Sequence, residues 1–459
     1  MLDTSAKGLA QELLAGEELR DKRLGEAARI VKQYHGLTYE GSPALGEPEN
    51  HAFEYISLVV PQMIFENPAV TIRDSDADPE IAALEQAMNS WIRLMNLRSV
   101  GVDLAVDQCF SWGIARIDQQ AQPGWIPGQV NQNQSQDIPR VPFIRRVPQN
   151  RHIMDSLCLK PAMARWQAQL VIRDQDDMLR VAEKYPEQGW NAKAIKAVPT
   201  GDQIRKARPN REGMRTLNRK EIAFFEVWIP EEELDESLGP QFGFHGTIRT
   251  IACGREDAEY AELRKPRPYY GPPGGPFVHF GTHIVPDEPW WMSALYPAQT
   301  QVRDLNNHGI AIREAAAAHK RIALGDALQK ADSDRIAKAK NGAFLLVNGL
   351  DKNKVVEITL GGVDEAMMVY RAFARDLLDR TSGMSDQARG VATGDATLGE
   401  NMIAQANTDI RTHMVKRQYA AAMTEALTCA GWFLWHDERS QVLVGVGKTF
   451  LGGALADHA

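Results

Sequence analysis

Residues 298–319 have the sequence AQTQVRDLNNHGIAIREAAAAH, and residues 364–381 have the sequence DEAMMVYRAFARDLLDRT. Each stretch predicts an α-helix of about 20 residues, which is roughly 30 Å long at 1.5 Å per residue. Prolines and tryptophans punctuate the approach to the first helix: Pro286, Pro289, Trp290, Trp291 and Pro297. As an antiparallel hairpin, two helices of this length can join separate layers of a structure. This arrangement is more typical of an assembly component than of an enzyme core.

The segment between the two helices, residues 320–363, predicts a small domain of its own. We expect a strand at Lys320–Leu324, a short helix at Asp332–Lys340, and a hairpin of Ala343–Val347 with Lys354–Leu360 around Asn348-Gly349. The segment has a net charge of +3, from five acidic and eight basic residues, the latter being Lys320, Arg321, Lys330, Arg335, Lys338, Lys340, Lys352 and Lys354. This charge fits either an ordinary solvated surface or a docking surface for a protein or for DNA.

A polar stretch and a long helix follow the second helix. Residues 382–397 are rich in Gly, Ser, Thr and Asp, and this composition predicts a flexible loop. Residues 400–437 then predict one long helix, which Thr397 can cap with Glu400 completing a capping box. The remaining residues at the carboxyl end, 439–459, form a short tail.

The first 285 residues predict a mixed α+β region. Helices are expected at residues 1–36, 50–66, 78–96, 102–110 and 175–184, with Pro61 and Asn67-Pro68 breaking the second. Strands are expected at residues 114–119, 143–147, 167–172, 222–229, 247–253 and 277–280, with a surface loop at 123–142. The predicted fold class of the whole chain is therefore α+β.

Composition excludes several classes of protein. The chain has 459 residues, 44% of them hydrophobic, and a net charge of −8. The negative charge argues against a protein that binds nucleic acid tightly through counterion release, but it is compatible with a protein past which DNA slides. No apolar run approaches the roughly 20 residues of a membrane span, and the charged amphipathic start does not resemble a signal peptide, so we expect a cytoplasmic protein without membrane contact. Four isolated cysteines predict buried free thiols: Cys109, Cys158, Cys253 and Cys429.

Three patterns suggest chemistry, and each has a simpler explanation. Val444–Thr449 ends like a phosphate-binding loop, but Val442 replaces the first glycine and too little chain follows, so a strand or turn is expected. Asp74, Asp76, Asp78 and Glu85 partly match a calcium loop, yet Pro79 replaces its turn glycine, which favours an acidic loop capping the next helix. His279 and His283 lie in a predicted strand and turn, where a spacing of four does not put them on one face. We therefore expect no catalytic residues, no metal and no cofactor.

The order of these segments resembles the portal proteins of tailed bacteriophages, from about His51 to Asp437. The short stretches that carry the resemblance are Val60-Pro61, Asn67-Pro68, Val147-Pro148, Asp155, Phe225–Trp228, Trp290–Asn306 (with Gln301, Leu305 and Asn306), Ser382-Gly383 and Ala396–Glu400. The resemblance implies a wing (1–285), an approach and first stem helix (286–319), a clip (320–363), a second stem helix (364–382), a tunnel loop (383–399), a long wing-to-crown helix (400–438) and a short tail (439–459). The crown would then be short or nearly absent.

The resemblance also implies a function without catalysis. Portal proteins form a ring, usually of twelve subunits, at one capsid vertex of the virion, and DNA passes through it non-specifically during packaging and ejection. The implied partners are double-stranded DNA, the large terminase, the major capsid or scaffold protein and a head-tail adaptor. Ring assembly would take place in the host cytoplasm. The alternatives are another head-tail connector ring or a DNA-processing enzyme, which would need a carboxylate metal cluster or an intact phosphate loop.

The resemblance assigns roles to three groups of residues. Ser385, Gln387, Arg389 and Thr393 would line the channel as a tunnel loop, unless the segment is only a surface linker. The eight basic residues of 320–363 would form the clip docking surface. Ala315, Ala316, Ala317 and Ala318 would let neighbouring stem helices approach closely, although the same run also fits simple helix propensity.

Overall fold

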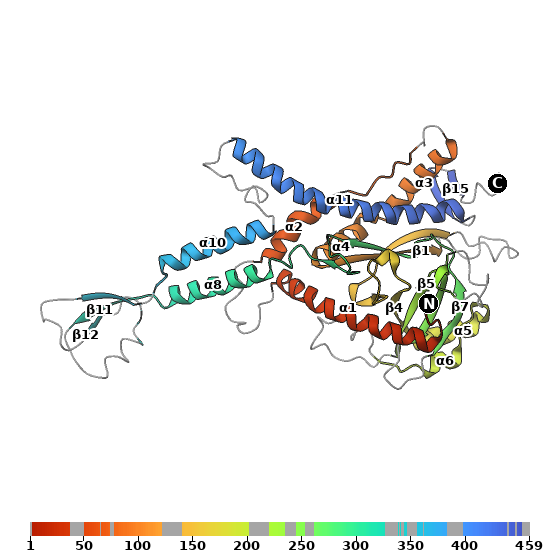
Figure 1. Ribbon diagram of the computed structural model, residues 1–459, viewed down its shortest axis with the longest axis horizontal. Helices are drawn as coiled ribbons and strands as arrows, with labels where there is room; N and C mark the ends of the chain where they lie inside the picture. Colours follow the sequence, from red (N-terminus) through yellow and green to blue (C-terminus); the bar gives the residue numbers. More distant parts are fainter. Residues whose placement is uncertain are drawn as a thin grey trace. The chain divides into compact units, whose positions relative to one another are not determined.

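The computed structural model describes residues 2–36, 50–64, 66–73, 78–121, 140–201, 220–234, 245–252, 261–325, 338, 340, 344–346, 356–360, 362–382, 398–437, 440–445 and 448–451. Within these residues helices combine with mainly antiparallel sheets, which confirms the α+β class (Figure 1). The chain forms two compact units. The first comprises Met1–Arg29, Ile56–Ala294 and Ile410–Ala459, and the second comprises Ile30–Tyr55 and Leu295–Asp409.

A five-stranded antiparallel sheet lies at the centre of the first unit, in the order β3-β4-β5-β6-β7. The strands are β3 (His152–Met154), β4 (Gln167–Asp174), β5 (Glu221–Ile229), β6 (Thr247–Ala252) and β7 (Glu262–Pro268). Alternate residues of the central strand β5 point to opposite faces, so Phe224 and Phe225 enter different cores. Both faces of β5 are therefore buried.

Helices cover the two faces of this sheet. On one face, α1 (Ala6–Tyr34) packs Leu9 and Leu13 against Trp166 and Val227. On the other face lie α5 (Gln175–Lys184), capped by Asp174, and α6 (Ala192–Ala197), capped by Asn191. Figure 1 shows these helices around strands β4 to β7.

A second sheet of the first unit has three strands in the order β2-β1-β8. These strands are β1 (Trp112–Ala121), β2 (Arg140–Arg146) and β8 (Phe277–Gly281). Helix α4 (Leu97–Phe110) packs against β1 closely at Gly113, where an added Cβ would lie 2.8 Å from the carbonyl oxygen of Leu104. Tyr419 of α11 (Leu398–His436) donates a hydrogen bond to the carbonyl oxygen of Gly101, 3.0 Å away, and so fastens α11 to α4.

The remaining elements of the first unit are short, apart from two helices. Helix α2 (His51–Met63) contributes its residues from Ile56 onward, and α3 (Pro79–Leu94) begins at the N-cap Asp78, as the acidic-cap interpretation predicted. Two small sheets complete the unit: β9 (His283–Ile284) with β10 (Trp291–Met292), and β14 (Gln441–Gly445) with β15 (Lys448–Leu451). The last pair shows that strands, one of the two expected structures, occur where the sequence ends like a phosphate loop. The 3-10 turns are Gln149–Arg151, Pro161–Met163, Pro186–Gln188 and Glu231–Glu233.

The second unit contains both helices of the predicted hairpin. Helix α8 spans Gln299–Ala317 and α10 spans Glu365–Ser382, each within a residue or two of the prediction. Between them lies a three-stranded sheet of β11 (Lys320–Gly325), β12 (Phe344–Leu346) and β13 (Val356–Leu360). The predicted hairpin of 343–347 with 354–360 is wrong, because β12 and β13 do not pair with each other. Both flank β11, β12 in parallel and β13 antiparallel.

Candidate functional site: the α8–α10 hairpin

Helices α8 and α10 lie side by side, and β11 and β12 lie beyond one end of the pair (Figure 1). Their shared core is small and comprises Ala298, Val302, Leu305, Ala374 and Leu378. On α8 the buried positions follow helical spacing and include Gly309. The hairpin is therefore held by one apolar stripe on each helix.

Helix α10 carries a second apolar stripe that the hairpin leaves exposed. The exposed fractions are 63% for Val369, 44% for Tyr370, 61% for Phe373 and 41% for Leu377. These four residues follow i, i+1, i+4 and i+8 spacing and so share one face, which is separate from the face that holds Ala374. We call this set the α10 stripe. Contiguous exposed apolar surface of this kind usually marks an interaction site.

Ring contacts order part of the α10 stripe. Tyr370 packs against His308 of α8 with ring centroids 4.3 Å apart, and its ring lies 6.4 Å from that of Phe373. On the solvent side Arg380 pairs with Asp376 at 2.8 Å. The stripe is thus held on a helix by neighbouring side chains of the same unit.

The beginning of α8 is fixed by a reciprocal amide pair. The Nε2 of Gln33 donates to Oε1 of Gln299 at 2.9 Å, and the Nε2 of Gln299 donates to Oε1 of Gln33 at 3.0 Å. The end of α1 is thereby joined to the first turn of α8. Two satisfied amides in this position restrict how α8 can rotate.

The connection from β13 to α10 requires glycine at one position. Gly362 has φ +120°, and an added Cβ would lie 3.0 Å from Nδ1 of His319. Immediately after it, Asp364 caps α10 by accepting a hydrogen bond from the amide of Ala366 at 3.3 Å. Gly362 and Asp364 thus fix the backbone immediately before α10.

The structure places only some of the residues predicted to be functional. Lys320 and Arg321 begin β11, and Lys338 and Lys340 are exposed. Ala315 is half-buried, whereas Ala316, Ala317 and Ala318 are exposed at the end of α8, away from the hairpin core. The other predicted residues lie outside the described part of the chain: Lys330, Arg335, Lys352, Lys354, Ser385, Gln387, Arg389, Thr393, and the predicted cap Thr397.

The α10 stripe was not identified from the sequence, although the sequence contains a signal for it. A helix that buries one face needs an apolar arc of about 100°. Residues 364–381 carry apolar side chains well beyond that arc, because the buried set and the α10 stripe occupy different faces. The excess width is the signal that could have indicated a second contact surface.

The described residues also show where the cysteines and the two histidines of the sequence analysis lie. Among the described residues no group of three or more His, Cys, Asp or Glu residues is placed to hold a metal ion. Three of the four cysteines are described and are free thiols, as predicted, and burial raises the pKa of Cys109 to about 12. A thiol that stays protonated at neutral pH is a poor nucleophile. His279 and His283 lie on the separate strands β8 and β9.

None of the helices that the structure describes is long and apolar enough to cross a membrane. Comparison with protein-family models gives no match, and comparison with curated proteins gives none either.

Proposed function

We propose that this chain is a subunit of a portal ring, the channel through which a tailed bacteriophage packages and ejects its DNA. The observation that carries the proposal is the α8–α10 hairpin, which ends in a small sheet and has an apolar stripe left exposed on α10. The order of segments in the sequence, which resembles portal proteins, supplies the particular kind of ring.

The energetics of the α10 stripe favour self-assembly. Fully burying a large apolar side chain contributes about 1.5–3 kcal/mol, so covering the four residues of the stripe offers several kcal/mol per contact. That gain is offset by the cost of ordering two molecules. In a closed ring each subunit takes part in two contacts, one through each of its two faces, whereas in an isolated pair it takes part in one, so closure is more favourable than an isolated pair.

The remaining parts of the proposal rest on the resemblance. The tunnel-loop residues would touch passing DNA without fixed contacts, and the basic residues of 320–363 would dock the terminase and later the adaptor. Of these, Lys338 and Lys340 have exposed side chains available for such contact. The protein would act mechanically, and a separate partner would hydrolyse ATP.

Electron microscopy of the purified protein tests the proposal. End-on views should show a ring of about twelve subunits with an axial hole. The variant Phe373→Asp places a charge in the proposed contact and should abolish rings. The matched variant Val181→Asp changes an apolar residue of α5 that is 38% exposed, and it should leave rings intact. A monomer or dimer without a channel at high protein concentration would contradict the portal proposal.

A further inference from the structure

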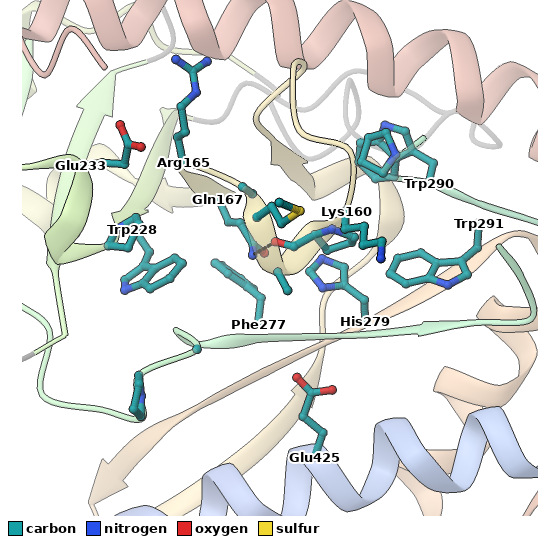
Figure 2. Close-up of a pocket in the computed structure, with 18 of the residues that line it drawn as sticks. Lys160, Arg165, Gln167, Trp228, Glu233, Phe277, His279, Trp290, Trp291 and Glu425 are labelled. Atoms are coloured by element: carbon teal, nitrogen blue, oxygen red, sulfur yellow. Dashed lines mark hydrogen bonds between the residues drawn. The ribbon is translucent and has the colours of Figure 1, made fainter. Parts of the chain in front are cut away.

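The first unit contains a pocket of about 660 Å³ beside the β8 strand. Figure 2 shows its aromatic wall, formed by Trp228 of β5, Phe277 and His279 of β8, Trp290, which precedes β10, and Trp291, the first residue of β10. His279 stacks on Trp291 with ring centroids 5.6 Å apart, and its other neighbour is the buried ring of His152 at 5.1 Å. The wall is therefore a packed set of rings with defined positions.

Two large apolar side chains that line the pocket are exposed to solvent. Met163 and Ile284 line it, and they are 64% and 66% exposed. Leu157 and Leu159, in the same loop as Met163, are 74% and 50% exposed. Exposed apolar surface next to a concave aromatic site is typical of protein recognition.

The loop that carries these side chains is braced from within. Asp155 is buried and accepts hydrogen bonds from Nε and Nη2 of Arg165, at 2.6 and 2.9 Å, and from the amide of Leu157 at 3.0 Å. A 3-10 turn at Pro161–Met163 shapes the middle of the loop. The aliphatic side chains are thus held toward solvent by a defined loop structure.

The charge around the pocket is negative. Its lining includes four carboxylates, Glu232, Glu233, Glu288 and Glu425, against two cations, Lys160 and Arg165. Asp155 already pairs with Arg165, and Arg23 pairs with Glu288, so Glu232, Glu233 and Glu425 remain against Lys160. Burial lowers the pKa of His279 to about 3, so this ring is neutral at physiological pH and does not offset the carboxylates.

We propose that this pocket is a docking site for a peptide segment of another protein that presents apolar side chains flanked by Lys or Arg. The aromatic wall would take one large apolar side chain, the exposed Met163 and Ile284 would cover its neighbours, and the rim carboxylates would pair with the basic residues. A small molecule confined to the pocket would leave much of the exposed Met163 and Ile284 side chains uncovered. The occupant is therefore larger than the pocket itself.

This inference does not depend on the portal proposal, because all of the pocket residues belong to the first unit. A chain that fails to form rings can still bind such a peptide. Conversely, a ring without peptide binding would leave the α10 stripe argument untouched.

The test is selection from a random twelve-residue peptide library displayed on phage, using the whole protein as bait. Counter-selection uses the double variant Met163→Glu, Ile284→Glu, whose substitutions fall on exposed side chains and leave the fold intact. We expect enrichment of peptides that combine Leu, Trp or Phe with Lys or Arg. A selected peptide, measured by fluorescence anisotropy, should bind the double variant at least tenfold more weakly than the wild-type protein. Leu94→Glu, on a residue of α3 that is 55% exposed, should bind like wild type.

Three outcomes would overturn the proposal. One is no enrichment on a correctly folded protein. A second is enrichment of basic peptides without apolar residues that bind the double variant equally well, since this indicates charge attraction alone. The third is a double variant that loses self-association while no peptide is enriched, which would mean that another copy of the chain covers this surface.

Discussion

At the scale of single residues, Arg116 of β1 carries a charge between the two main sheets of the first unit. Its guanidinium donates to Glu226 of β5 at 2.6 Å, to Gln169 of β4 at 2.9 Å and to Asp118 at 3.0 Å. Burial opposes ionisation of Glu226, but the charges of Arg116 and Arg267 and the hydrogen bond from Arg116 together lower the pKa of that carboxyl. The two charges are therefore stable only together.

We predict that Glu226→Ala lowers the free energy of unfolding by about 3–5 kcal/mol, because it leaves the Arg116 charge largely buried without its main partner. The double change Arg116→Met, Glu226→Leu should cost less than the single change, since it removes both charges. Thermal unfolding measures both effects. As a control, Asp177→Ala breaks an exposed ion pair with Arg180 and should lower the free energy of unfolding by less than about 1 kcal/mol. A Glu226→Ala protein as stable as the control would refute this role of the pair.

Asp155 makes stability depend on pH in the acid range. Burial alone would raise its pKa, but hydrogen bonds from Arg165 and from the amide of Leu157 lower it below the ordinary value of 3.8. A carboxyl whose pKa is lowered in the folded protein stabilises the fold at pH values above its ordinary pKa. This stabilisation is lost as the pH falls through the pKa of the folded state. We predict that Asp155→Asn destabilises the protein at pH 7 and flattens the fall in unfolding temperature below about pH 4. Unfolding temperatures between pH 2 and 7 check this, with the exposed Asp177→Asn as control, and an unchanged acid slope would contradict it.

At the scale of elements, the α8–α10 hairpin depends on few buried side chains. Leu378 is 2% exposed and packs on the small core with Leu305 and Val302. Leu378→Ala should lower the free energy of unfolding by about 2–5 kcal/mol, because it removes contacts and leaves an unfilled cavity. Hydrogen exchange should show the resulting loss of protection in α8 and α10, while β4 and β5 of the first unit keep theirs. The exposed Leu377 provides a matched control, since Leu377→Ala should leave exchange within the hairpin unchanged.

Most long elements could be predicted from sequence because their apolar spacing is local information. The errors occur where position in the fold overrides local signals. Pro61 was expected to end a helix but lies inside the last turn of α2. Strand β7 was missed because of Pro266 and Pro268, yet prolines are tolerated there since β7 is an edge strand.

Pairing within the small sheet could not be predicted for a related reason. The Asn348-Gly349 signal favours a hairpin, whereas β11 lies between β12 and β13. Which strand takes the central place depends on contacts between distant segments, and periodicity does not encode them. The candidate site shows the same limit. The two helices were predicted to within a residue or two, but which apolar face stays exposed becomes evident only once the hairpin is packed.

At the scale of the whole molecule, the symmetry of the proposed contact can be distinguished from that of a simple dimer. In a ring, the α10 stripe of one subunit meets a different surface of its neighbour, so each subunit has two unlike contact faces. In a symmetric dimer, the stripe would meet its own copy. Phe373→Asp then removes one face in a ring, but the only face in a dimer.

Mixing experiments follow from this difference. A Phe373→Asp subunit in a ring system keeps its second face, so it can still join the stripe of one wild-type neighbour and end the chain there. We predict that small amounts of the variant convert wild-type rings into open arcs that shorten as its fraction rises, with mass photometry giving the size distribution. The variant Val181→Asp should co-assemble into full rings at every ratio. If the α10 stripe instead meets its own copy, Phe373→Asp will be excluded from assemblies and the wild-type species will keep its size, because a subunit that has lost its only contact face cannot terminate anything.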